Sequence, residues 1–496
     1  MNEPAAIYAV EARPEPFAED VFPAVAGGII GAAAADALGW ITEFVRGRDH
    51  LLKIYRTDYV SEYRSWQKTT GGRFNAYVDY ISKGEYSDDT QLTLAVARSL
   101  LADGSVDPDH FANLELPLWL DYSRGAGSTI MGAARALKGR KSTRWNNNFF
   151  GYKHRGDGRD YRSAGANGAA MRIGPIALAN IKDAARMALG VWKTSAATHG
   201  HPRALLGALI HAEALRRCAG DGDLRHGHVL LAELGEYVRT TIPPNDEGIM
   251  SWLAEWDRGS ERPFSDLWEA TRAETLRGLS LVSSVASRAD LLPLMKELGC
   301  FDRETKGSGI ATVLAGLAIF LVLGDDFREA VLFAVNALGS DTDTIGGFVG
   351  GLCGAAHGYG HVDHNWASEL QDYEYFMRIA TEVARIVKGA GMGGRALLPE
   401  RNSEQGGLPD LVQRLKDHDV AVDERVYHPL FGAGWVKAVD AQNLRRRDGA
   451  QVVFARVTFD IGQTCKFRYM QVPGSAGRLS GRATQVESSG QEGLFA

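Results

Sequence analysis

Apolar residues recur at helical spacing through most of the chain, from about residue 22 to residue 395. The segment from Pro202 to Gly220 is typical, because its leucines fall on one broad face and the pattern stops at a glycine. Proline suits the first turn of a helix, where its missing N–H group has no partner to lose. No run in this region alternates with a period of two, so the pattern predicts an all-α domain.

The pattern changes near residue 389. The next twenty or so residues are rich in Gly, Pro and polar side chains, as linkers are. A short helix is expected at 410–417, and from Glu424 three runs alternate with a period of two, which predicts a small all-β barrel. The chain therefore has five predicted parts: an N-terminal extension at 1–21, a helical domain at 22–395, a linker at 396–420, a barrel at 421–473 and a disordered tail at 474–496.

Composition and charge narrow the class of protein. The 55 Lys and Arg and 61 Asp and Glu residues give a net charge of −6, which argues against a surface wholly adapted to nucleic acid. The four cysteines fit neither a disulfide framework nor a zinc site, and no secretory signal is visible, so we expect reduced thiols in the cytoplasm. Residues 307–324 lack charge, but their many small residues favour a buried core helix over a membrane span.

Two acidic clusters stand at expected helix starts, at residues 87–90 (Ser-Asp-Asp-Thr) and 340–344 (Ser-Asp-Thr-Asp-Thr). Capping explains one such residue per helix, because Ser, Asp and Thr satisfy free N–H groups and complement the helix dipole. Crowding four carboxylates is costly unless a cation offsets their charge. Hard oxygen ligands of this kind suit Mg²⁺, Mn²⁺ or Ca²⁺. Capping and a shared metal site both stay open, because the spacing does not show that the clusters meet.

Five motifs then occur in one order along the chain. They are Ala35-Asp36-Ala37-Leu38-Gly39 with Glu43, the cluster at 87–90, Asn167-Gly168-Ala169-Ala170-Met171-Arg172, Thr198-His199-Gly200-His201-Pro202, and the cluster at 340–344 with Ile345-Gly346. Together they resemble the ADP-ribosylglycohydrolase family, which includes the dinitrogenase reductase-activating glycohydrolases, over about residues 22–395. The resemblance implies a compact all-α fold, two Mg²⁺ or Mn²⁺ ions in a central cleft, and hydrolysis of the bond between ADP-ribose and a modified protein.

The resemblance also assigns roles by position. Glu43 is the acidic residue beside the scissile bond and, with Asp89, is the predicted catalytic pair. The predicted metal ligands are Ser87, Asp88, Asp89, Asp341, Asp343 and Thr344. The predicted substrate-binding residues are Asn167 and Gly168 at the diphosphate, Gly125 and Gly127 in a second wall, and His199 facing the substrate. His201 and Arg172 are expected to be structural.

The acceptor stays open. Residues 46–85 are long and polar-aromatic, residues 140–161 are basic and aromatic, and Ser163-Ala164-Gly165 stand where serine-acting relatives have Gly-Ser-Tyr. A basic aromatic loop could stack a base or be a solvated insert. Arginine-linked protein is the favoured substrate; serine-linked protein, small molecules and nucleic acid are the alternatives. A non-catalytic ADP-ribose-binding protein is a further alternative, which the retention of all the expected ligands disfavours.

The C-terminal strands carry a second resemblance. Residues 425–436 and 457–460 resemble the Tudor-like, SH3-type barrel at the end of UvrD-type helicases. This resemblance implies a docking module for RNA polymerase or another protein. We therefore expect a cytoplasmic metal-dependent hydrolase that reverses toxin or regulatory ADP-ribosylation and is targeted or regulated by its barrel.

Overall fold

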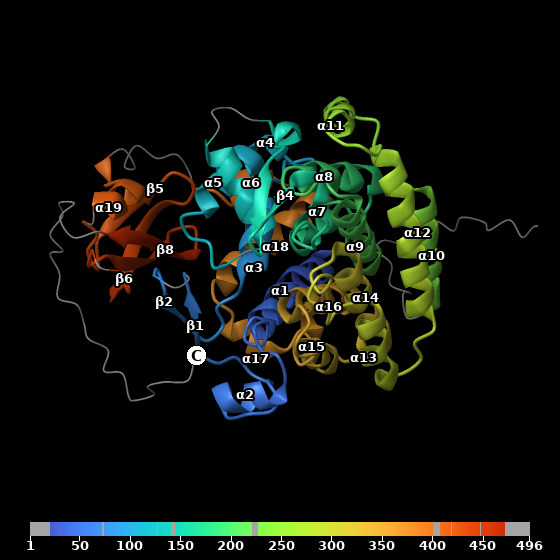
Figure 1. Cartoon of the computed structure of the whole chain (residues 1–496), viewed down its shortest axis with the longest axis horizontal. Helices are drawn as coiled ribbons and strands as arrows, with labels where there is room; N and C mark the ends of the chain where they lie inside the picture. The colour runs from blue at the N-terminus through green and yellow to red at the C-terminus, as the bar shows by residue number, and fades with distance from the viewer. Residues whose placement is uncertain are drawn as a thin grey trace, which may run out of the picture.

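The computed structural model describes residues 20–71, 74–125, 127–139, 144–220, 227–399, 407–417, 419–446 and 448–471. The predicted tail at 474–496 and all but the last two residues of the predicted extension at 1–21 lie outside these ranges. Helices form most of the body, and a small sheet lies at one end of it, at the left in Figure 1.

The helices of the first half are α1 (Phe22–Gly39), α2 (Arg48–Tyr55), α3 (Asp88–Arg98), α4 (Pro108–His110), α5 (Leu116–Trp119), α6 (Ser128–Gly139), α7 (Gly174–Ala179), α8 (Ala184–Ala196), α9 (Pro202–Gly220) and α10 (Gly227–Thr240). Those of the second half are α11 (Glu247–Arg258), α12 (Phe264–Ser283), α13 (Arg288–Glu297), α14 (Gly309–Leu323), α15 (Phe327–Val335), α16 (Thr342–His357), α17 (His364–Glu369), α18 (Tyr373–Val387) and α19 (Leu411–Asp417).

Helices α1 and α16 cross at the centre of the body, backbone against backbone. A Cβ atom on Gly27 would lie 2.1 Å from the carbonyl oxygen of Gly354, so a side chain does not fit at this crossing. A Cβ atom on Gly39, at the end of α1, would lie 2.4 Å from the carbonyl oxygen of Thr342, where α16 begins. The same packing therefore brings the turn after α1 beside the second acidic cluster.

The apolar helices belong to the core. Helix α14 is buried along nearly its whole length, in agreement with the prediction for residues 307–324. Within the described residues, α1 is the one helix long and apolar enough to cross a bilayer, and 78% of its apolar window is buried inside the protein. All four cysteines are buried free thiols.

Two hairpins correct the expectation of an all-α body. Strands β1 (Trp66–Thr70) and β2 (Tyr77–Ile81) form one, and β3 (Gly151–His154) and β4 (Asp157–Asp160) form the other. Strand β4 is exposed on both faces, so it carries no alternation of apolar and polar residues that could be recognised. Its turn has positive φ angles at Arg155 and Gly156, as a tight two-residue hairpin requires.

The C-terminal strands form a sheet, but not a closed barrel. Strands β5 (Arg425–His428), β6 (Gly432–Asn443), β7 (Gln451–Phe459) and β8 (Thr464–Gln471) are antiparallel in that order. Among the described strands β5 and β8 do not pair, so the predicted barrel is wrong and the sheet is open. The sheet packs its aromatic face on the helices instead of closing on itself: Phe431 and Phe467 both contact Tyr122 of the body.

Candidate functional site

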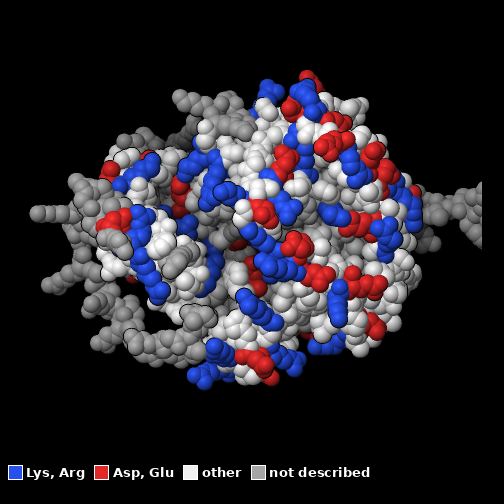
Figure 2. Space-filling view, in the orientation of Figure 1, with Lys and Arg blue, Asp and Glu red and all other residues white. Residues whose placement is uncertain are grey.

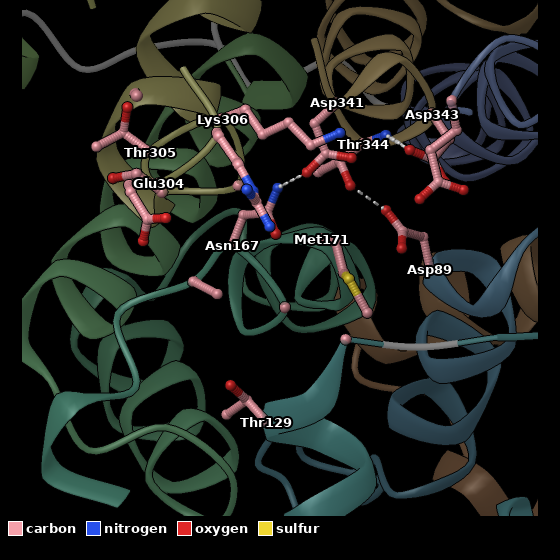
Figure 3. Close-up of a pocket in the computed structure, with 18 of the residues that line it drawn as sticks. Asp89, Thr129, Asn167, Met171, Glu304, Thr305, Lys306, Asp341, Asp343 and Thr344 are labelled. Atoms are coloured by element: carbon pink, nitrogen blue, oxygen red, sulfur yellow. Dashed lines mark hydrogen bonds between the residues drawn. The ribbon is translucent and has the colours of Figure 1, made fainter. Parts of the chain in front are cut away.

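Both acidic clusters line a single cleft with a volume of about 1670 Å³. Figure 3 shows Asp89, at the start of α3, and Asp341, Asp343 and Thr344, at the start of α16, turned toward one another. Figure 2 shows Lys and Arg side chains gathered around the middle of one face of the molecule, with acidic side chains between them. The fold therefore joins two clusters that lie about 250 residues apart in the sequence.

Capping accounts for only part of these clusters. Ser87 is the N-cap of α3, and its hydroxyl accepts a hydrogen bond from the N–H of Asp89 at 3.1 Å. Asp341 stands at the N-cap of α16 but makes no side-chain capping bond. Its Oδ2 instead accepts a hydrogen bond from Nδ2 of Asn167 at 2.8 Å. The carboxylate of Asp341 thus points into the cleft rather than onto its own helix.

Glu43 joins the second cluster. It lies in the turn after α1, and one carboxylate oxygen from each of Glu43, Asp341 and Asp343 lies within 4.8 Å of the other two. Across the same cleft, Oγ1 of Thr344 donates a hydrogen bond to Oδ2 of Asp89 at 2.7 Å. A set of carboxylate and hydroxyl oxygens at this spacing fits a divalent cation such as Mg²⁺ or Mn²⁺.

The electrostatics of the cluster favour the same ligand. Burial and neighbouring carboxylates raise the pKa of Glu43 to about 8. Burial raises the pKa of Asp88 to about 7, although the ammonium of Lys68 opposes this shift. The pKa values of Asp89 and Asp343 lie well above the usual range, first through burial and then through neighbouring carboxylates. A cation bound among these groups would offset the repulsion and keep them ionised.

Ser87 and Asp36 support the first cluster from behind. Ser87 is fully buried and does not line the cleft, unlike the other predicted metal ligands. Its N–H donates to Oδ2 of Asp36 at 3.1 Å, and the N–H of Thr90 donates to the same oxygen at 3.3 Å. The sequence did carry a signal for this role, because Asp36 is the one charged residue of the otherwise apolar helix α1.

The predicted substrate-binding residues line the same cleft. A Cβ atom on Gly168 would lie 3.1 Å from Cε1 of His199, so the loop after Asn167 runs directly over this imidazole. His199 is fully buried; its Nδ1 pairs with the hydroxyl of Thr198 at 2.7 Å, and its Nε2 has no hydrogen-bond partner among the described residues. Burial holds the pKa of His199 well below the usual range, so the ring is neutral.

The remaining predicted residues differ in how they contribute. Gly125 adopts a φ of 138° beside Asp88, a conformation that favours glycine, and Gly127 also lines the cleft. Arg172 is fully buried and donates from Nη1 to the carbonyl oxygen of Gly168 at 2.5 Å, in agreement with its expected structural role. His201, which was also expected to be structural, lies on the cleft wall.

Sequence patterns did not reveal two further parts of the cleft wall. Lys68, on β1, donates a hydrogen bond to the carbonyl oxygen of Arg124 at 2.6 Å, and its ammonium lies 4.4 Å from the ring centroid of Trp40. The β3–β4 hairpin, which falls within the basic aromatic segment, contributes Tyr152, His154, Arg155 and Arg159 to the cleft. Both parts lie on the hairpins that the helical pattern concealed.

Comparison with known proteins gives a consistent result. A family model described as ADP-ribosylglycohydrolase matches residues 18–392. The ADP-ribosyl-[dinitrogen reductase] glycohydrolase of Rhodospirillum rubrum is 25% identical over 364 residues, which cover 73% of this chain and 93% of that protein. ADP-ribosylhydrolase ARH3 of Bos taurus is 24% identical, over 73% of this chain and 92% of its own. ADP-ribosylarginine hydrolase Tri1 of Pseudomonas putida is 23% identical, over 72% of this chain and 76% of its own.

Proposed function

The chain belongs to the ADP-ribosylglycohydrolase family, and on this premise we propose that it is a metal-dependent hydrolase that removes ADP-ribose from modified protein, with arginine as the favoured acceptor. Two of its relatives, from Rhodospirillum rubrum and Pseudomonas putida, are named for hydrolysis of an ADP-ribosylated protein and of ADP-ribosylarginine. Cytoplasmic reversal of a toxin or regulatory modification is the role we propose for this activity.

One observation carries the proposal. Carboxylates from the turn after α1 and from the starts of α3 and α16 line one cleft, and three of them lie within 4.8 Å of one another. Such crowding raises the free energy of the metal-free protein, and capping leaves Asp341 unexplained. We therefore propose Asp88, Asp89, Asp341, Asp343 and Thr344 as the residues that hold two Mg²⁺ or Mn²⁺ ions, with Ser87 as their support.

The residues of the cleft divide the chemistry between them. Divalent cations, when bound, would fix the hydroxyls of the ribose and lower the pKa of a water. Cleavage at the ribose passes through an oxocarbenium-like state, and a carboxyl group must exchange a proton with the leaving or attacking atom. Glu43 lies within 4.8 Å of Asp341 and Asp343 in this cleft, and its carboxyl group can give or take such a proton. We assign this proton exchange to Glu43.

The cleft wall next to the acidic clusters is proposed to hold the ADP moiety. Asn167 contacts Asp341, and Gly168 follows it in a loop whose backbone N–H groups can approach a diphosphate. Gly125 and Gly127 form a second wall, and we assign the neutral His199, which lines the cleft beneath Gly168, to the substrate-binding residues. We do not extend the proposal to RNA polymerase as a partner of the sheet, because the aromatic face of the sheet already packs on the body.

The experiment that tests this function is a panel of conjugates offered to the full-length chain. ADP-ribose linked to an arginine peptide, a serine peptide, a DNA end and a small guanidine would each be incubated with Mg²⁺, Mn²⁺ or EDTA. We expect ADP-ribose to be released fastest from arginine, to stop in EDTA and to resume when metal is restored. Tight binding of ADP-ribose without release from any conjugate would identify a binding protein instead.

A further inference from the structure

The C-terminal sheet shares its hydrophobic core with the helical body. Phe431 and Phe467 belong to the same buried cluster as the residues of α1, α3 and α16, and both rings contact Tyr122 at centroid distances of 5.2 and 5.9 Å. A module that merely docks other proteins would cover its apolar side chains by itself, whereas here even the separate cluster of the sheet packs against Tyr77 of β2; that cluster consists of Leu444, Ala450, Val452 and Phe454. Here the apolar face of the sheet is already covered by the body from which the cleft is made.

The sheet holds the C-terminal end of α3, the helix whose first residues are Asp88 and Asp89. Arg98, the last residue of α3, is fully buried and forms an ion pair with Glu115 at 2.7 Å. Its Nη1 also donates to Oε1 of Gln463, between β7 and β8, at 2.8 Å. A buried guanidinium needs all its partners, so loss of the sheet would leave part of this charge without one.

The sheet also holds the loop before α3. Arg456, on β7, donates from Nη2 to Oε1 of Glu85 at 2.8 Å and to Oγ of Ser82 at 3.2 Å. The hydroxyl of Tyr86 donates to Asp372 at 2.8 Å, and Asp372 in turn accepts from the N–H of Thr464 on β8 at 3.0 Å. The two residues that directly precede the first acidic cluster are therefore tied to the sheet, one directly and one through a single residue.

The third contact is with the β1–β2 hairpin, which Figure 1 shows beside the strands of the sheet. The amide of Gln442 accepts from the N–H of Val78 at 3.0 Å and donates to its carbonyl oxygen at 2.7 Å. Lys466 pairs with Asp79 at 2.5 Å. Asp79 lies opposite Lys68 in the register of the hairpin, and Lys68 extends into the cleft toward Glu43 and Asp88.

These contacts reach the loop before α3, the far end of α3 and the hairpin that carries Lys68. We propose that the C-terminal sheet is a built-in support of the cleft, which it does not itself line, and that Arg456 is a positioning residue that fixes the first acidic cluster through Glu85. This inference rests on the proposed function only for the identity of the bound metal. It differs from docking because removal of the sheet contacts would disturb the acidic site even with a small substrate or with no substrate.

The test measures Mn²⁺ affinity of the full-length chain by calorimetry. Arg456→Gln shortens the side chain and removes the charge that reaches Glu85, and we expect it to weaken Mn²⁺ binding about tenfold or more, as loss of a residue that orients metal ligands does. Arg456→Lys should restore most of the affinity. Arg425→Gln is the matched control, because Arg425 forms its ion pair with Asp460 within the sheet, and it should bind Mn²⁺ as the wild type does.

Glu85→Gln approaches the same contact from the other side, and keeps the test decisive if Arg456→Gln fails to fold. Both substitutions break the contact between Arg456 and Glu85, so the free-energy loss in the double variant should be smaller than the sum of the two single losses. Wild-type Mn²⁺ affinity in Arg456→Gln or in Glu85→Gln would overturn this inference alone. A wild-type chain that binds no Mn²⁺ would overturn the proposed metal site as well, whereas a chain that binds Mn²⁺ but cleaves no conjugate would overturn only the proposed activity.

Discussion

Replacing Asp341 with Asn is expected to lower kcat/KM for the arginine conjugate roughly 10³-fold. The amide keeps the size of the side chain, but it removes a charge that faces Glu43 and Asp343 within 4.8 Å. The change should not destabilise the metal-free protein, because it relieves repulsion among crowded carboxylates. The measurements are steady-state kinetics at saturating Mn²⁺ and thermal unfolding in EDTA.

The control for this variant is an aspartate that only caps. Asp326 is the N-cap of α15, where its side chain accepts from the N–H of Glu329 at 2.9 Å, and it does not line the cleft. Asn caps helices about as well as Asp, so Asp326→Asn should leave activity within a factor of two or so of the wild type. Equal, small effects of the two substitutions would favour the capping interpretation of the second cluster.

The second large effect is expected from Glu43→Gln. This substitution keeps the shape of the side chain but prevents it from giving or taking a proton, so kcat should fall by roughly 10² to 10⁴. Retained binding of ADP-ribose, measured by calorimetry, would place the loss in the chemical step rather than in assembly of the cleft.

Glu274→Gln is the matched control for Glu43→Gln. Glu274 lines the same cleft but pairs with Arg203 at 2.8 Å, away from the acidic clusters. We expect its kcat to change by less than about threefold, as for an exposed ion pair that takes no part in catalysis. A change in kcat of less than about threefold in Glu43→Gln as well would rule out proton exchange at Glu43.

The sequence predicted the helical body well because apolar residues recur at regular helical spacing over a long stretch of the chain. It also singled out both acidic clusters, since several carboxylates at a helix start exceed what capping needs. It could not show that the clusters meet. The clusters meet because glycines such as Gly27 let α1 and α16 approach backbone to backbone. Such a contact does not change the spacing of apolar residues along either helix, so the sequence pattern cannot reveal it.

The errors have local physical causes. The hairpins escaped prediction because their four strands are only four or five residues long and β4 is exposed along its whole length. The barrel was expected to close because apolar and polar residues alternate along its strands. Such alternation does not show which part of the protein covers the apolar face. The partners of that face include Tyr122 and Arg98, more than 300 residues earlier in the chain, and no pattern linked them to the sheet.

The central claim is that the two acidic clusters bind a divalent cation together, and Mn²⁺ affinity measured against pH tests it most directly. Asp88 is one of the proposed ligands, and its pKa of about 7 means that it must lose a proton when the cation binds at lower pH. Calorimetry in buffers of different ionisation enthalpy should therefore record proton release when Mn²⁺ binds. The Mn²⁺ affinity should be at least roughly tenfold weaker at pH 6 than at pH 8. Absence of Mn²⁺ binding, or an affinity that does not change with pH, would contradict the account.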